Sequence, residues 1–278
     1  MAHKWGILDD LVGTSYKVRT GLTLYYPFEE TDGTNVQDIS PNLLNGELID
    51  GSLNVGGYFG SGVEFDDEDN AQISLGLNQI QLPMNWTISA WFTTPFSDDN
   101  AWFVHALTSG SNDAHVAFLA DPTNRVLGSF DNAFESSGFS AFSLSHGWHH
   151  LVAVGNGGET SFWIDGNSVG SVQANVSSPV EAIGNLPGGS GRFANKIDDF
   201  RIFNRALGDL EIGDLYGGGN GDFGSHYYSN FSPIFDNVPE IITPSAPLVH
   251  WTLNELNGTI IPDSSGKNND GNASTFSD

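Results

Sequence analysis

Two acidic clusters carry the residue types that could do chemistry in this chain. The first is the adjacent pair Asp198 and Asp199, which opens the segment KIDDFRIF. The second is EFDDEDNAQI, in which Glu64, Asp66 and Glu68 alternate. Carboxylates at such spacing can bind a divalent cation, or can serve as acid and nucleophile in sugar hydrolysis. The elements that hold them decide between these chemistries.

The surroundings of the second cluster do not favour hydrolysis. Retaining glycoside hydrolysis needs two carboxyls about 5–5.5 Å apart, a spacing that alternate residues of one strand could supply. Asp67, however, is charged where a sandwich strand should place an apolar residue, and Asp69 and Asn70 continue as a turn. We interpret this cluster as a solvated turn, with a weak cation site as the alternative.

Motifs of other enzyme classes are absent from the sequence. There is no Gly-x-Ser-x-Gly, Walker or His-Glu-x-x-His motif. His149 and His150 are adjacent on an expected strand and so face opposite sides, which makes them a poor zinc pair. The sequence therefore predicts that the chain is not an enzyme.

The charge balance restricts the partners. Among 278 residues, 34 are acidic and 9 basic, giving a formal charge of -25. Such a surface repels phosphates, so we expect neither nucleic acid nor an anionic membrane as a partner. It suits cation binding or simply solvation. There is no cysteine, no secretory signal at the start, and no apolar run of about 18 residues that could span a membrane.

The sequence pattern predicts an all-β fold. Short runs of β-branched and aromatic residues alternate with turns roughly every 8–12 residues, which is typical of a two-sheet antiparallel sandwich. A short helix is expected around 208–216. The expected strands are 23–28, 62–65, 72–75, 86–93, 102–107, 115–119, 126–130, 149–155, 160–164, 167–172 and 197–203.

An internal repeat indicates more than one unit. Residues 25–46 align without gaps on 250–271, and the aligned pairs include Glu30/Glu255 and Asp38/Asp263. We therefore expect a docking segment at 1–21, a complete domain at 22–216, a Gly- and Pro-rich linker at 217–245, and the start of a second repeat at 246–278. Either the polypeptide continues, or the final segment is a lone strand that pairs with a neighbouring sheet edge.

Three segments resemble one family in their order along the chain. They are the repeated YYPFEETDGTNVQDIS motif, GWHHLVAVGNGGETSFWIDGNSVGS, and KIDDFRIF with its helical tail. Over 22–216 the chain resembles the laminin-G-like, concanavalin A-like lectin/glucanase jelly roll, in its bacterial and phage form. The resemblance implies a jelly-roll sandwich closed by pairing an early strand with a late one, and a short helix anchored by Arg205. The fold alone does not define a function.

The resemblance also implies a structural Ca²⁺ between the first and last strands. Matched onto this sequence, the ligands would be Glu30, Asp38 and Asp198, with carbonyl groups around Gly33. Strand alternation places Asp198 on the core side with Phe200, where an unpaired carboxylate is costly. The alternatives are that Asp198 pairs with Arg201 or Arg192, or that it caps a turn.

The expected function is a non-catalytic structural or adhesion protein. A sheet lined with aromatic and amide groups could bind a glycan, and the candidate ligand-binding residues are Trp102, His105 and His115, with Trp91, Phe103 and Asn112 as further groove residues. Each of these side chains could equally fill the core. We expect a phage virion appendage that meets a glycan or host surface. The first residues would dock onto other virion or assembly proteins, in a homo-oligomer at the virion or extracellular surface. A bacterial surface adhesin is the alternative.

Overall fold

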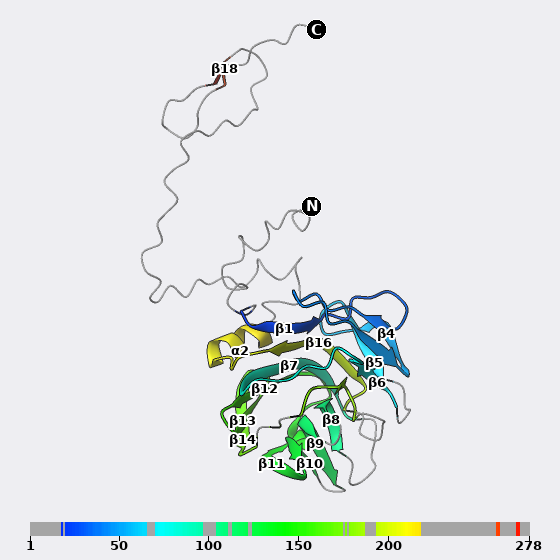
Figure 1. Cartoon of the computed structure of the whole chain (residues 1–278), viewed down its shortest axis with the longest axis vertical. Helices are drawn as coiled ribbons and strands as arrows, with labels where there is room; N and C mark the ends of the chain where they lie inside the picture. The colour runs from blue at the N-terminus through cyan, green and yellow to red at the C-terminus, as the bar shows by residue number, and fades with distance from the viewer. Residues whose placement is uncertain are drawn as a thin grey trace, which may run out of the picture. The chain divides into compact units, whose positions relative to one another are not determined.

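The computed structural model describes residues 18, 20–65, 70–96, 104–110, 113–121, 124–174, 176, 178–186, 193–217, 260–261 and 271–272. The chain divides into two compact units, Met1–Asn230 and Phe231–Asp278. Most of the described residues belong to the first unit, which is built of strands (Figure 1). No helix among the described residues is long and apolar enough to cross a membrane.

The first sheet contains both ends of the domain. Its strands follow the order β14-β13-β12-β7-β16-β5-β4, and β1 pairs with β16. The bounds are β1 Leu22–Tyr26, β4 Gly51–Gly56, β5 Ser61–Phe65, β7 Asn85–Thr94, β12 Gly147–Asn156, β13 Glu159–Ile164, β14 Asn167–Val172 and β16 Lys196–Phe203. Figure 1 shows β1 and β16 side by side. The early strand is thus paired with the late strand, as the resemblance implies.

The second sheet has the order β11-β10-β9-β8-β15-β6-β3-β2. The bounds are β2 Asn35–Val36, β3 Gly46–Ile49, β6 Gln72–Ser74, β8 Val104–Ser109, β9 Ala114–Asp121, β10 Asn124–Asp131, β11 Ala133–Ser140 and β15 Ala182–Ile183; a 3-10 turn, η2, spans Ala141–Ser143. All pairings in both sheets are antiparallel. The expected two-sheet sandwich is confirmed.

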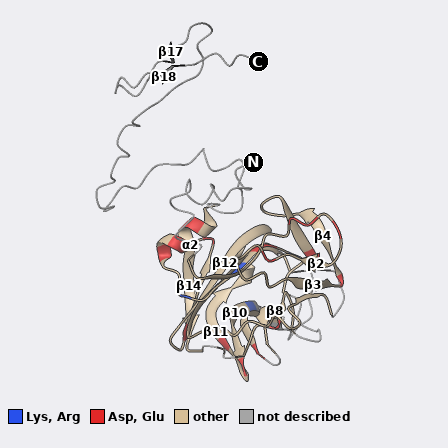
Figure 2. Cartoon of the chain, turned by 45° about the horizontal axis from the view of Figure 1, so that its top comes forward, with Lys and Arg blue, Asp and Glu red and all other residues tan. Residues whose placement is uncertain are grey.

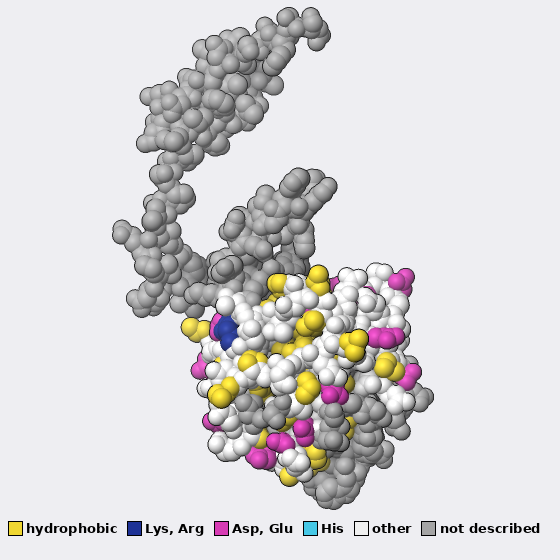
Figure 3. Space-filling view, viewed as in Figure 1, with side chains coloured by type: hydrophobic (Ala, Val, Ile, Leu, Met, Phe, Trp, Pro, Cys, Tyr) yellow, Lys and Arg dark blue, Asp and Glu magenta, His cyan; other side chains and the backbone are white. Residues whose placement is uncertain are grey.

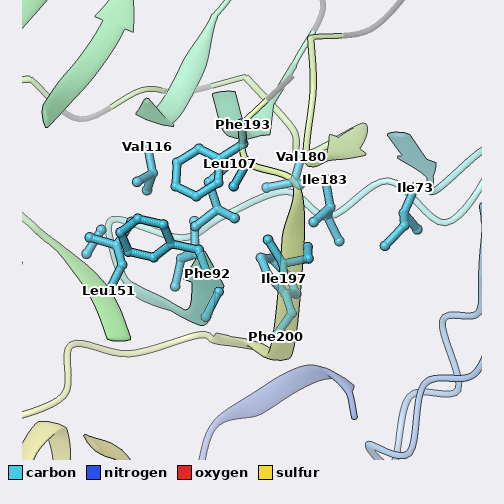
Figure 4. Packing of buried hydrophobic residues seen from close by; sticks show 14 of the residues in the cluster. Ile73, Phe92, Leu107, Val116, Leu151, Val180, Ile183, Phe193, Ile197 and Phe200 are labelled. Atoms are coloured by element: carbon cyan, nitrogen blue, oxygen red, sulfur yellow. The ribbon is translucent and has the colours of Figure 1, made fainter. Parts of the chain in front are cut away.

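One large apolar core lies between the sheets. The rings of Phe92 and Phe193 have centroids 5.4 Å apart in an edge arrangement, and Phe118 lies 5.7 Å from Phe193. Leu107 and Val116 from the second sheet complete this packing (Figure 4). Burial of such side chains contributes roughly 1.5–3 kcal/mol each, so this core is the main stabilising element of the fold.

Helix α2, Asp209–Tyr216, packs on the outer face of the first sheet. Its Ile212 and Leu215 are buried with Val152 and Val154 of β12, whereas Leu210 is 84% exposed. The helix start is held by Arg205, which donates to both carboxylate oxygens of Glu211 (2.8 and 2.6 Å) and to the Thr20 carbonyl. The anchoring role predicted for Arg205 is confirmed.

Each strand expected from the sequence is present, with ends shifted by a few residues. The strands β2, β3, β4, β11 and β15 were not expected, because they are short or rich in Gly and Ser. The turn Asp165–Gly166 between β13 and β14 has φ values of 50° and 74°. Two successive positive φ angles define the tight hairpin turn that Asp-Gly favours.

The second unit contains two described strands, β17 Ile260–Ile261 and β18 Gly271–Asn272. Ile261 pairs with Gly271, and Ile260 with Asn272. In the first unit Val36 pairs with Gly46, and Asn35 with Glu47. These are the positions related by the repeat offset, since 261 − 36 and 271 − 46 are both 225. The local pairing therefore recurs, although a complete second domain stays a prediction.

Acidic residues are distributed over several surfaces of the first unit. Figure 2 shows Asp and Glu on α2, around β4 and at the end of the β10–β11 pair. In the space-filling view of Figure 3, apolar side chains are scattered among polar ones on the face turned to the viewer. Within the described part of the first unit, acidic residues are thus spread over several elements rather than gathered in one patch.

Candidate functional site: an aromatic platform on the first sheet

Asp38 organises the loop that follows β1. Its Oδ1 accepts hydrogen bonds from the backbone N–H groups of Tyr25 (2.9 Å) and Ser40 (2.8 Å). Its Oδ2 accepts from the Ser40 hydroxyl (2.7 Å) and from the Leu44 N–H (2.8 Å). The side chain is 3% exposed. Four hydrogen bonds satisfy this buried carboxylate without a metal.

Glu30 lies close to the same loop. Its Oε1 accepts from the Gln37 N–H at 2.7 Å, while Oε2 is buried and has no hydrogen-bond partner. Both acids act on Tyr26, whose pKa is raised by burial and then by the negative charges of Asp38 and Glu30. The structure thus brings Glu30 and Asp38 into one neighbourhood.

Asp198 lies elsewhere, and its orientation differs from the prediction. The pairing of β16 with β7 shifts by one residue between Asp198 and Arg201, and Asp199 has a φ of 51°. This bulge interrupts the alternation, so Asp198 lies opposite Trp91 on the outer side of the sheet instead of sharing the core side with Phe200. The predicted core-side placement is therefore wrong.

The Asp198 carboxyl caps the β4–β5 loop. It accepts from the N–H groups of Phe59 (2.8 Å) and Asp199 (2.7 Å). Burial raises its pKa to about 8, because desolvation outweighs those two hydrogen bonds. Gly57 is required beside it, since a Cβ there would lie 2.7 Å from Asp198 Oδ2 and 2.4 Å from the Ser61 carbonyl. Of the alternatives from the sequence, the turn cap is observed, and Arg192 lies outside the described residues.

Arg201 pairs with Asp199 instead. Its Nη2 donates to Asp199 Oδ1 at 2.8 Å and to the Tyr25 hydroxyl at 3.0 Å, and the guanidinium lies 4.2 Å from the centre of the Tyr25 ring. Across the residues that the structure describes, no three His, Cys, Asp or Glu side chains form a set that could hold a metal ion. Calcium binding stays a prediction.

The predicted ligand-binding histidines are enclosed. His105 is 1% exposed and lies 5.5 Å from the Phe96 ring. His115 is fully buried, and its Nε2 is 2.9 Å from the Ser178 carbonyl; burial lowers its pKa. Neither imidazole lines an open groove in this structure. Trp102, Phe103 and Asn112 lie outside the described residues.

A serine–histidine pair on the outer face of the first sheet invites comparison with a nucleophile and its base. Ser89 Oγ is 2.9 Å from His150 Nε2, and His150 is 1% exposed. Burial, together with the charge of Arg201, lowers the pKa of His150 to about 3. A general base works best with a pKa near the operating pH. The buried His150 imidazole is therefore neutral near pH 7, and its low pKa makes it a poor general base.

His150 also belongs to a cluster of aromatic rings that sequence reasoning missed. Its floor is Trp91 of β7 and His150 of β12, which are directly paired across the sheet with centroids 5.0 Å apart. The Tyr58 ring stacks on Trp91 at 3.4 Å with an interplanar angle of 9°. Tyr216 stacks at 5.8 Å from Trp91 and 6.1 Å from His150. Trp148 meets Tyr58 edge-on at 6.5 Å.

We call the rings of Tyr58, Trp148 and Tyr216, over Trp91 and His150, the aromatic platform. The floor is buried, but Tyr58 is 43% and Tyr216 39% exposed, and Trp148 is half-buried. Three separate elements supply the exposed rings: the β4–β5 loop, the start of β12 and the end of α2. The platform is therefore a composite surface that exists only when the first sheet and α2 are assembled.

Polar groups border the platform. Asp165 accepts from the His150 N–H at 2.8 Å and from His149 Nδ1 at 2.7 Å, and its side chain is 27% exposed. Gly166 lies against the Tyr216 ring, and a Cβ at this position would be 3.0 Å from the nearest ring carbon. The pKa of Tyr58 is raised by burial, then by Tyr216 and by the charge of Asp165. The phenol therefore stays protonated and can donate a hydrogen bond.

The sequence contains one signal that could have revealed this surface. In GGYFGSG, two aromatic residues stand in a glycine-rich turn, where they have little chance of joining the core. Sequence reasoning instead treated Trp91 as one groove residue among several. The other contributors come from distant positions and could not be connected without the fold.

Comparison with known proteins identifies the family. The profile described as the concanavalin A-like lectin/glucanases superfamily matches residues 66–213, which is more than half of the chain. The chain belongs to this family. Among curated protein sequences, none matches.

Several solved structures share the fold. The binding domain of Paraclostridial Mosquitocidal Protein 1 has a TM-score of 0.54 at 20% identity, over 73% of this chain and 53% of that one. The botulinum neurotoxin serotype D ligand-binding domain, in complex with N-acetylneuraminic acid, has 0.50 at 16%, over 74% and 53%. A Trypanosoma rangeli sialidase has 0.50 at 14%, over 73% and 34%. This chain spans about half or less of each, and such identities establish the fold alone.

Proposed function

We propose that the first unit is a non-catalytic glycan-binding domain and that the aromatic platform is its sugar-binding surface. The observation that carries the proposal is the stacking of Tyr58 on Trp91 with 43% of Tyr58 exposed. An aromatic ring held flat by a second ring presents a rigid apolar face. The C–H face of a pyranose packs on such a face, and little conformational entropy is lost on binding.

The polar border supports the same proposal. The hydroxyl groups of Tyr58 and Tyr216 can donate or accept, and the partly exposed carboxylate of Asp165 can accept from sugar hydroxyls. A few placed polar groups around an aromatic surface are typical of small-ligand sites. Two of the solved relatives carry sialic acid or a related sugar acid in their names, which supports a sugar-binding use of the fold but not a particular sugar for this chain.

The candidate catalytic groups favour a binding role over catalysis. The Ser89–His150 pair is buried and its imidazole is held neutral. Glu64, the first carboxylate of the alternating acidic cluster, lies on β5 and pairs with Lys196 at 3.8 Å. Asp66 and Glu68 lie outside the described residues. A pair of carboxyls flanking a sugar bond is what hydrolysis would require.

A glycan array probed with the full 278-residue chain tests this function. We expect hits that are lost in Tyr58→Ser and in Trp148→Ser. Phe142→Ser is the matched control, because Phe142 is an aromatic side chain, 60% exposed, outside the platform. Unchanged melting temperatures would show that all three variants fold. An array without hits, or hits that survive both platform substitutions, would overturn the proposal.

We further propose a structural or adhesion role on a phage virion, with a bacterial surface adhesin as the alternative. The acidic, cysteine-free composition and the recurring β17–β18 pairing support an array of exposed domains. In this proposal residues 1–21 dock onto assembly proteins and the chain is a homo-oligomer. An antibody to this chain that labels purified phage particles would support the virion role. Label on cell surfaces without particles would support the adhesin.

A further inference from the structure

We propose that the aromatic platform selects uncharged sugars and discriminates against sialylated, sulfated or otherwise anionic glycans. This inference rests on the proposed function and names the class of ligand for that same surface. Two observations carry it: the partners of the cationic side chains, and the acidic groups that border the platform.

The first observation concerns the basic residues that an anionic sugar would need. Arg201 is 3% exposed and bonded to Asp199. Arg205 is engaged by both oxygens of Glu211, and Lys196 is 3.8 Å from Glu64. Arg125 is 5% exposed, with its guanidinium 4.9 Å from the centre of the Phe96 ring. In the described part of the chain, each cationic side chain thus has a partner within the fold.

Carboxylates recognise sialic acid poorly, whereas a guanidinium or ammonium group supplies a charge-assisted hydrogen bond to its carboxylate. Using one of these four cations for a ligand would break an existing ion pair or uncover a buried side chain. The remaining basic residues, Lys4, Lys17, Arg19, Arg192 and Lys267, lie outside the described residues.

The second observation is the negative charge at the platform itself. Asp165 is close enough to Tyr58 to raise its pKa, and its side chain is 27% exposed. Glu29 is exposed and accepts from the N–H of Ser61, the first residue of β5 after the loop that carries Tyr58. The chain as a whole carries -25. Exposed charges interact over about 8 Å at physiological salt, so a bound anion would be repelled by these neighbours.

The same groups suit an uncharged sugar. A carboxylate accepts hydrogen bonds from hydroxyl groups, and hydrogen bonds to a charged acceptor contribute more than neutral ones. A protonated tyrosine hydroxyl can donate to a ring or hydroxyl oxygen. The border of the platform therefore complements a polyol in hydrogen bonding and opposes an anion in charge.

Paired glycans test the inference on the full-length chain. The probes are neutral galactose-terminated oligosaccharides and their sialylated or sulfated derivatives, which are otherwise identical. We expect each neutral member to bind at least tenfold more tightly at low salt. The difference should shrink at high salt, because screening weakens the repulsion.

A charge variant at the rim makes the test sharper. Asn167 is exposed and directly follows the Asp165–Gly166 turn. Asn167→Lys should raise affinity for the sialylated probes several-fold with the neutral probes unchanged, and Asn167→Gln is the matched uncharged control. Equal or tighter binding of the anionic probes by the wild-type chain would overturn the inference while glycan binding stands. A full glycan array without any hit would instead overturn the proposed function, and this inference with it.

Discussion

Arg201 donates to Asp199 over 2.8 Å, and both side chains are within a few per cent of complete burial. A buried ion pair stabilises little by itself, but loss of one partner leaves an uncompensated charge. We expect Arg201→Met to lower the free energy of unfolding by about 3–5 kcal/mol, measured by urea denaturation.

The matched control for Arg201→Met is Lys196→Met, which removes a partly exposed ion pair with 3.8 Å between its atoms. That change should cost less than about 1 kcal/mol. The double variant Arg201→Met/Asp199→Asn also removes the unpaired negative charge of Asp199. It should therefore recover part of the free energy of unfolding that Arg201→Met loses. Equal losses of stability in Arg201→Met and Lys196→Met would contradict the burial of the Arg201–Asp199 ion pair.

Asp198 should make stability fall as the pH rises. Its pKa is raised from 3.8 to about 8 in the folded protein, so between pH 4 and 8 the folded state binds more protons than the unfolded state. The contribution of this group is therefore greatest below pH 4 and declines toward pH 8, by at most about 1.4 kcal/mol per pH unit.

The quantity to measure is the difference between wild type and Asp198→Asn at a series of pH values, since the other carboxylates affect both proteins alike. The wild type should lose stability relative to the variant as the pH rises from 4 to 8. A difference that is independent of pH would show that Asp198 is ionised throughout.

Helix α2 offers a comparison within one element. Ile212→Ala removes a buried side chain and should cost about 2–5 kcal/mol, whereas Leu210→Ala, on the exposed side, should change stability by less than about 0.5 kcal/mol. Because α2 carries Tyr216, Ile212→Ala should also weaken glycan binding. Thermal melts and array binding of the two variants provide the check. Similar behaviour of both variants would argue against the packing of Ile212 on the first sheet.

Calcium is best tested at Glu30, whose Oε2 is buried without a hydrogen-bond partner. Such an atom can belong to an ion site. If calcium binds there, the melting temperature should rise with added Ca²⁺, by an amount equivalent to about 2.7 kcal/mol at a hundred times the dissociation constant.

Glu30→Gln should abolish this calcium-dependent rise, whereas Asp198→Asn should retain it, because Asp198 caps a different loop. A melting temperature that does not respond to Ca²⁺ or to chelation would remove the calcium prediction altogether.

The regular part of the fold could be predicted from the sequence. Residues such as Leu151 and Val152 alternate between two buried faces, and Asp165–Gly166 has the chemistry of a hairpin turn. The alternation pattern gave the wrong face for Asp198, because the bulge at Asp199 adds one residue to β16. One extra residue reverses which side chains point to the core, and the alternation itself does not reveal where a bulge occurs. Short strands such as β15 have too few residues to show any period.

The candidate site was harder to predict for a different reason. Tyr58 and Trp91 are far apart in sequence, and although the glycine-rich turn around Tyr58 suggests an exposed ring, nothing in the sequence connects it with Trp91. Only the assembled sheet shows that Trp91 is the buried floor of the platform and that Tyr58 is exposed above it. The sequence pattern predicted the longer strands and the helix, whereas the contacts between them depend on loop paths that propensities do not encode.

The pairing of β1 with β16 also affects how the domain is made. Tyr25 meets a partner 176 positions further along the chain. During synthesis, β1 cannot form its backbone hydrogen bonds to β16 until nearly the whole domain has been synthesised. Contacts between such distant segments slow folding and leave strand edges open to aggregation. Nascent chains of this protein should therefore depend on chaperones until the final strand emerges.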